Sequence, residues 1–465
     1  KIRMDANKSI PTELGTEKIS KLLKQYALPA IIAQTASSLY NMVDSIFIGH
    51  GVGPLAISGL AVTFPLMNLS TAFGTLVGVG ASSLMSILLG QRNYNAANKV
   101  LGNVVTLNII LGIVFMIVAL TFIDPILYFF GASENTLPYA KDYIKIILYG
   151  NIVTHLYFGL NAQMRSSGFP KKAMALTIFT VALNTVLDPL FIFVFDMGIK
   201  GAAWATVIAQ IAALVIVMNH FNDRNKALHF EKGIIRLDWR IAKESLGIGF
   251  GPFLMNAAAC LVTLFINQQL RKYSGDLGIG AFGICNRISF MFIMICLGLN
   301  QGMQPIAGYN FGARKYSRVK EVFWRTVGLA SIATCICFII CVIFPVPAVS
   351  VFTHDPELVE MSAKGLRTMN SAVLIIGAHI VSTNLFQCLG MVRKSIILSL
   401  SRQILFLLPL LYILPLNFGE IGVWMSSPLS DVLSCILAFT MLGSLFKKFS
   451  KLKDGDDPGI LGSQL

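Results

Sequence analysis

The stretch VVTLNIILGIVFMIVALTFI, residues 104–123, contains no charged side chain over its whole length. A helix rises about 1.5 Å per residue, so about twenty residues cross the roughly 30 Å of hydrocarbon in a bilayer. Similar apolar stretches recur along almost the whole chain, which is 55% hydrophobic and only 13% charged. A soluble domain has about 25% charged residues and could not bury so much apolar surface. The sequence therefore predicts an integral membrane protein.

Twelve such stretches predict twelve transmembrane helices, because backbone groups that face lipid must form their hydrogen bonds within their own segment. The predicted spans are 25–48, 55–89, 102–124, 142–162, 171–195, 200–219, 245–270, 277–308, 323–352, 366–389, 393–416 and 420–445. Of the 37 Lys and Arg, 28 fall on the side of the two termini and seven on the other side. This bias predicts cytoplasmic termini, and it favours contacts with lipid headgroups over contacts with nucleic acid.

The chain also contains an internal repeat. The segment GQRNY at 90–94 matches GARKY at 312–316, at an offset of 222 residues. Three further pairs agree to within one residue: Gly80 with Gly302, Gly168 with Gly390, and Pro29 with Pro252. We therefore expect a cytoplasmic tail (1–24), an N-terminal lobe (25–219), a cytoplasmic linker (220–244), a C-terminal lobe (245–445) and a second tail (446–465). An even number of spans in each half gives both halves the same orientation, as in transporters built from parallel repeats.

The motifs that are missing narrow the class of protein. The sequence contains no metalloprotease, serine hydrolase or channel-filter motif, so transport is favoured over catalysis or passive conduction. All eight cysteines lie in apolar spans of the second half without metal-binding spacing. We therefore expect no enzyme activity, no cofactor and no cysteine metal site.

Acidic side chains inside spans are costly and are candidates for function. Asp44 lies toward the outer end of the first span, with Tyr40 and Asn41 on the same helix face, and Asp188 is expected in the middle of the fifth span, one turn after Asn184. Carboxylate and amide oxygens are ligands suited to a proton or Na⁺. Two neighbouring acids also favour keeping a proton on one of them. The sequence predicts a cation-coupling site here, with possible Na⁺ binding at Asp44, Asn184 and Asp188.

A third acid, Asp431 in the twelfth span, has two interpretations. It lies opposite Gln210 in the repeat, which suggests matching polar positions facing a cleft. Arg402 on the neighbouring span could instead neutralise it, and both a structural ion pair and a substrate contact remain open. The predicted substrate-cleft residues are Gln34, Asn41, Gln210, Asn256 and Asp431.

These motifs resemble the multidrug and toxic compound extrusion (MATE) family. The likeness rests on NMVD at 41–44 with FIG at 47–49, on Asn184 with Asp188-Pro189, and on the two GxRxY loops. The resemblance implies an all-α fold of two six-helix bundles with a V-shaped cleft between them. It implies export of organic, mainly cationic compounds in antiport with H⁺ or Na⁺, with a hinge at Pro29.

Within that family the chain resembles the DinF-like or MepA-like branch. That likeness places the ion site at Asp44, Asn184 and Asp188, with Tyr40 and Thr206 as neighbours. The NorM-like branch has acids where this chain has Asn256 and Asn384, so coupling through the N-terminal lobe is expected. The alternative function is a flippase of lipid-linked oligosaccharides from the same superfamily. We expect a monomer in the bacterial inner membrane that binds lipid and small molecules.

Overall fold

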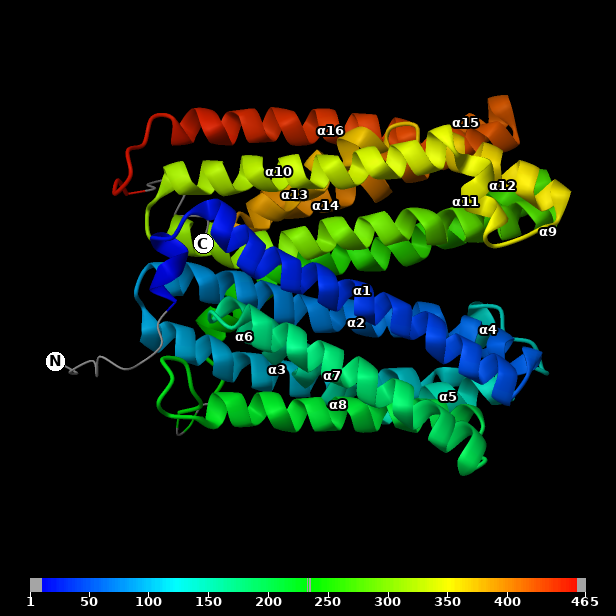
Figure 1. The fold of residues 1–465 in the computed structure, drawn as a ribbon, viewed down its shortest axis with the longest axis horizontal. Coiled ribbons are helices and arrows are strands. Elements are labelled where there is room, and N and C mark those ends of the chain that lie inside the picture. Colours follow the sequence, from blue (N-terminus) through cyan, green and yellow to red (C-terminus); the bar gives the residue numbers. More distant parts are fainter. Residues whose placement is uncertain (1–10, 232, 234–235, 458–465) are drawn as a thin grey trace. The chain divides into compact units, whose positions relative to one another are not determined.

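The computed structural model describes residues 11–231, 233 and 236–457, apart from the side chains of residues 41, 42, 45, 46, 49, 54, 57 and 276. Within these ranges the chain is almost entirely helical and contains no strand (Figure 1). It divides into two compact units. The first unit comprises residues 1–16 and 32–253, and the second comprises residues 17–31 and 254–465.

The first half of the sequence forms eight α-helices and one π-helical segment. These are α1 (Ile19–Gly51), α2 (Pro54–Gly90), α3 (Tyr94–Thr121), α4 (Ile123–Phe129), α5 (Leu137–Tyr149), α6 (Asn151–Ser166), α7 (Pro170–Pro189), the π-helix η2 (Leu190–Val194) and α8 (Ile199–Asn222). A 3₁₀ turn, η1 (Thr12–Gly15), precedes them. The long members lie along one another in the ribbon (Figure 1).

The second half repeats this pattern. Its elements are α9 (Trp239–Gly312), α10 (Tyr316–Phe338), the π-helix η3 (Ile339–Ile343), α11 (Pro345–Ser350), α12 (Pro356–Met369), α13 (Val373–Cys388), α14 (Val392–Leu400), the π-helix η4 (Ser401–Leu407), α15 (Leu408–Phe418) and α16 (Glu420–Phe449). The helix α9 is two spans joined at Gly275, whose φ of 63° and ψ of −152° are not helical.

In the described residues, nine helices are long and apolar enough to cross a membrane, and ten if the bent pair α12 and α13 counts as one span. The two remaining predicted spans, 25–48 and 142–162, are also helical in the structure but do not meet this test of length and composition. The helix α1 has 33 residues but is rich in polar side chains, and α5 and α6 are both short and meet at Gly150. The fold is therefore an all-α membrane architecture of two repeated bundles.

The helices differ from the predicted spans at several boundaries. The predicted linker extends to residue 244, whereas α9 begins at Trp239. The predicted span 142–162 is two helices, and the predicted span 366–389 contains a bend of 54° between α12 and α13. A hydropathy profile gives the length and polarity of a segment but not the direction of its helix axis, so it does not reveal such breaks.

Unusual backbone conformations recur at matching positions of the two halves. Arg92 and Arg314 both have a left-handed conformation, with φ of 59° and 58°. Such values are uncommon for residues other than glycine. Gly198 and Gly419, which begin the last helix of each half, have φ of 56° and 57°. The duplication seen in the sequence is therefore also present in the backbone.

Glycines permit the closest helix crossings. A Cβ on Gly80 would lie 2.0 Å from the carbonyl oxygen of Ser245, and a Cβ on Gly302 would lie 2.3 Å from the Cα of Ala27. Neither space can hold a side chain, so the backbones of the crossing helices touch directly. Through these contacts the first turns of α9 belong to the first unit, and the first turns of α1 belong to the second.

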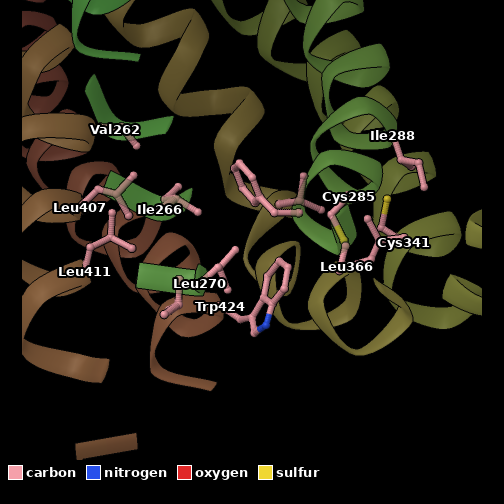
Figure 2. Packing of buried hydrophobic residues seen from close by; sticks show 14 of the residues in the cluster. Val262, Ile266, Leu270, Cys285, Ile288, Cys341, Leu366, Leu407, Leu411 and Trp424 are labelled. Carbon is pink, nitrogen blue, oxygen red and sulfur yellow. The ribbon is translucent and has the colours of Figure 1, made fainter. Parts of the chain in front are cut away.

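The second unit has an apolar core to which α9, η4 and α15 contribute. Val262, Ile266 and Leu270 lie on one face of α9 and pack in the same cluster as Leu407 and Leu411 (Figure 2). All five are at most 8% exposed. This part of the second unit is therefore filled by aliphatic side chains.

Candidate cation-binding site

Two buried carboxylates lie in the first unit. Asp44 on α1 is 5% exposed, and Asp188 on α7 is fully buried. The two carboxylates interact electrostatically. Asp188 lies past the midpoint of the apolar stretch Pro170–Val194. It is the last residue but one of α7, followed by Pro189 and the π-helix η2, because proline removes a backbone donor and disturbs the regular helix there.

Polar side chains from three helices join these acids. The amide of Asn184 is best oriented with its nitrogen donating to Asp188 Oδ2 at 2.9 Å and its oxygen accepting from the Thr206 backbone N–H at 2.9 Å. Tyr40 Oη lies 2.9 Å from Thr206 Oγ1. Hydrogen bonds therefore connect four of the five predicted coupling residues, Tyr40, Asn184, Asp188 and Thr206, and the fifth, Asp44, interacts with Asp188 through its charge.

Neither acid has a basic partner among the residues that the structure describes. The ion pairs between described residues involve neither Asp44 nor Asp188. Asp44 Oδ1 is buried and has no hydrogen-bond partner in the described part of the chain. An ionised carboxylate left alone in an apolar interior is very costly, so such a group takes up a proton or a cation. The arrangement of the oxygens suits either one.

Sequence reasoning missed one neighbour of this cluster. Tyr143 on α5 is 2% exposed and packs beside Ile48. The negative charges of Asp44 and Asp188 interact electrostatically with the Tyr143 hydroxyl group. The residue lies between Asp142 and Lys145 near the predicted start of a span, where a tyrosine ordinarily indicates only the membrane interface. No spacing in the sequence links it to the acids.

The predicted substrate-cleft residues are divided between the two units. Gln34 and Gln210 belong to the first unit, and Thr154 donates a hydrogen bond to Gln210. Asn256 and Asp431 belong to the second unit, where Arg402 Nε lies 2.6 Å from Asp431 Oδ1. The side chain of Asn41 lies outside the described residues. That these residues share one cleft remains a prediction, as does the hinge at Pro29.

The described residues contain no group of three or more His, Cys, Asp or Glu side chains placed to hold a metal ion. A monovalent cation needs fewer acidic ligands than a zinc or calcium ion, and amide and hydroxyl oxygens can complete its shell. Asp44, Asp188, Asn184 and Thr206 are the groups that could provide such a shell here.

Comparison with known proteins agrees with this geometry. The model of the MatE family matches residues 29–190 and 251–413, one segment in each half of the repeat. The chain belongs to the MATE family. It is thus a multi-pass membrane transporter, and the resemblance noted in the sequence is confirmed.

Individual relatives cover almost the whole chain. The multidrug export protein MepA of Staphylococcus haemolyticus (strain JCSC1435) is 28% identical over 92% of this chain and 94% of its own length. A solved structure of the MATE multidrug transporter DinF-BH with a bound dye is 38% identical, with a TM-score of 0.87, over 94% of this chain and 98% of that one. A transporter of the MOP superfamily from Pyrococcus furiosus shares the fold, with a TM-score of 0.90 and 22% identity over 96% of this chain and 100% of that one.

Proposed function

We propose that this protein exports organic, mainly cationic compounds in antiport with H⁺ or Na⁺ by alternating access. The observation that supports this most strongly is the buried pair Asp44 and Asp188, which has no basic partner in the described part of the chain. Multidrug export by MepA and the dye bound to DinF-BH support small-molecule drugs as the substrate class.

The carboxylate cluster can couple entry of H⁺ or Na⁺ to export of the substrate through its charge. With the cluster open to the outside, H⁺ or Na⁺ neutralises one or both acids. Neutralisation weakens the attraction for a cationic substrate, which then leaves. Release of the ion to the cytoplasm restores the negative charge and the affinity for the next substrate. Coupling needs only that ion and substrate favour opposite states of the protein.

The helix α1 can transmit the change in charge. It carries Asp44 in the first unit, while its first turns, up to Ile31, belong to the second unit. Pro29 lies close to this division and lacks the backbone N–H that would complete the helix. A bend at Pro29 would therefore let α1 respond when Asp44 gains or loses its partner ion.

The hydrogen bonds of Thr206 would hold the site in shape. This hydroxyl lies between Tyr40 on α1 and Asn184 on α7, and Asn184 in turn donates to Asp188. A cation that draws the two acids together would move both helices through these contacts.

Export from proteoliposomes tests the proposal. Ethidium movement is followed while a pH gradient and a Na⁺ gradient are imposed separately. We expect one of the gradients to drive export by the wild type, and Asp44→Asn to abolish it while the protein level is unchanged. The exposed acid Asp142, which pairs with Lys200, provides the matched control Asp142→Asn, expected to export normally.

Two outcomes would contradict the proposal. Undiminished gradient-driven export by Asp44→Asn would remove the acid from the mechanism. Movement of lipid-linked sugar, without ethidium export under either gradient, would instead support the flippase alternative.

A further inference from the structure

The second unit contains a buried ion pair in the middle of its helices. Arg402 Nε donates to Asp431 Oδ1 at 2.6 Å, and Asp431 is 2% exposed. Arg402 lies ten residues after the start of α14 at Val392, and Asp431 lies eleven residues after the start of α16 at Glu420. At about 1.5 Å per residue, both are about 15 Å along their helices, half the thickness of the hydrocarbon.

The arginine uses only one edge of its guanidinium for this pair. Asp431 receives the Nε–H, and the two terminal amino groups have no hydrogen-bond acceptor among the described residues. The side chain of Arg402 is 28% exposed, whereas that of Asp431 is almost fully buried. Charged groups at this depth face a bundle interior or a hydrated cavity, since exposure to lipid is costly. The unused edge of Arg402 is therefore the edge available to a ligand.

Nearby polar groups are also left without partners. His379 on α13 is 5% exposed, both of its ring nitrogens lack a hydrogen-bond partner in the described chain, and the charge of Arg402 acts on it. The buried Oε1 of Gln403 also lacks a partner there. Buried polar atoms in proteins are usually satisfied, so such atoms indicate a site that something else completes.

The local helix geometry supports the same conclusion. Arg402 lies in the π-helix η4, and Ser430 Oγ donates to its backbone carbonyl at 2.5 Å. Short π-helical segments are frequent at functional sites. Here the bulge aims Arg402 at α16, where Ser430 and Asp431 fix both its backbone and its side chain.

We propose that Arg402 binds a carboxylate group on the transported compound, with Asp431 as a positioning residue that holds the guanidinium. The terminal amino groups of an arginine match the two oxygens of a carboxylate. Because a carboxylate brings its own negative charge, it would not need to displace Asp431. The site would therefore extend the substrate range from plain cations to zwitterions that carry a carboxylate.

This proposal rests on the proposed export function, and it is tested with two substrates that differ in charge. Ethidium carries a positive charge and no carboxylate, whereas norfloxacin carries both a basic amine and a carboxylate. Liposomes made only of phosphatidylcholine keep anionic lipid from competing for the arginine. In Arg402→Gln the KM for norfloxacin should rise about tenfold or more, as for loss of a hydrogen bond to a charged group. Ethidium transport should stay near the wild-type rate.

A double variant separates recognition from folding. Removing Arg402 alone leaves Asp431 buried and unpaired, which can destabilise the protein. Arg402→Gln with Asp431→Asn removes both charges and leaves two groups that can hydrogen-bond. If Arg402 recognises substrate, the double variant regains stability but keeps the defect for norfloxacin. Arg287→Gln, at an exposed arginine of the same unit, is the control and should transport both compounds normally.

Three outcomes would overturn the proposal. Recovery of norfloxacin transport by the double variant would show that the pair is only structural. An equal loss of norfloxacin and ethidium transport in Arg402→Gln, or no loss of transport for either compound, would also show that Arg402 does not recognise the carboxylate. Loss of ethidium export in the wild type itself would contradict the proposed function instead, so the two failures can be told apart.

Discussion

The two halves of the protein share a backbone but differ in the chemistry of equivalent positions. Pro29 of α1 and Pro252 of α9 are 223 residues apart, and at this offset Asp44 corresponds to Asn267. Asp44 is one of the buried acids of the first half, whereas Ile266, the residue before Asn267, packs in an apolar cluster with Leu407 and Leu411 (Figure 2). One half thus has a buried acid where the other has an amide next to an apolar core.

In a second pair of equivalent regions, the charged residues lie in the second half instead of the first. His379 and Arg402 correspond to Tyr157 and Thr180 at the repeat offset of 222 residues, and Asp431 corresponds to Gln210 at an offset of 221. In the first half these positions are neutral, with Thr180 donating to Tyr157 Oη at 3.3 Å. In the second half they carry an ion pair. The helices match in both halves, while the acids that lack a basic partner in the described chain lie in one half and the charges of the ion pair lie in the other.

The largest expected effect is the loss of coupling in Asp188→Asn. We expect gradient-driven export to fall at least about tenfold, within the range of coupling free energies between linked sites. The control is Thr185→Val on the same helix, because the Thr185 hydroxyl bonds to the Val181 carbonyl and not to the acids. Efflux assays in proteoliposomes measure both variants. Normal export by Asp188→Asn would contradict the assignment of the coupling acids to the first half.

The apolar core of the second half should not accept an acid. Ile266→Asp places a carboxylate in the cluster with Leu407 and Leu411, without an amide partner such as Asn184 provides to Asp188. We expect destabilisation of about 2.5–3.5 kcal/mol, as for a charged residue at the centre of a membrane helix. Thermal melting in detergent measures this change in stability. The variant should also fail to restore export to Asp44→Asn, and restoration would show that an acid in the second half can replace Asp44.

Both halves have a close helix crossing at a glycine, so substitutions of these two glycines should change stability by similar amounts. Gly80→Ala and Gly302→Ala each introduce a Cβ into a backbone contact, and we expect a loss of about 1–3 kcal/mol from overpacking. A Cβ on Gly328 of α10 would meet no atom within 4 Å, so Gly328→Ala should be neutral or slightly stabilising. Melting temperatures of the three variants test this, and a neutral Gly80→Ala would contradict the close crossing.

The smallest effect concerns how the two repeat loops cap their helices. Asn93 accepts from the Ala96 backbone N–H at the start of α3, whereas Asp454 from the C-terminal segment accepts from the Ser317 backbone N–H at 3.0 Å at the start of α10. Replacing either cap by Ala should cost about 0.5–2 kcal/mol. Hydrogen exchange at Ala96 and Ser317 measures the local loss.

Only the Asp454 cap should depend on pH. Desolvation raises its pKa, but hydrogen bonds from Ser317 outweigh this and leave the pKa below its ordinary value. A lowered pKa means that the stabilisation is present above the ordinary aspartate pKa and is lost as the pH falls through the folded-state value. The difference in stability between the wild type and Asp454→Ala should therefore shrink in acid, while that for Asn93→Ala stays constant.

Much of this architecture was predictable from the sequence. Uncharged stretches such as 104–123 indicated membrane helices, and the pair GQRNY and GARKY indicated the duplication. The spacing of Asn184 and Asp188 placed both on one helix face, and the preferred orientation of the Asn184 amide lets it donate to Asp188. Patterns of this kind are local, so a sequence can display them.

The missed features depend on contacts between distant segments. Tyr143 was missed because it lies on α5, which packs against α8, the helix that carries Thr206, and no periodicity in the sequence predicts that contact. The break between α5 and α6 at Gly150 occurs where a Cβ would lie 2.6 Å from the Val207 side chain, so packing against α8 fixes it. The ion pair of Arg402 with Asp431 remained open in the sequence, because either residue could have faced another partner.

Proton or sodium release during substrate binding tests the central claim most directly. Ethidium is titrated into purified protein by calorimetry, in buffers of different ionisation enthalpy and at several Na⁺ concentrations. The account predicts that the wild type releases H⁺ or is inhibited by Na⁺, and that Asp44→Asn shows neither effect while Ile266→Val shows both. Equal release or inhibition in the wild type and Asp44→Asn would contradict a coupling site at the acids of the first unit.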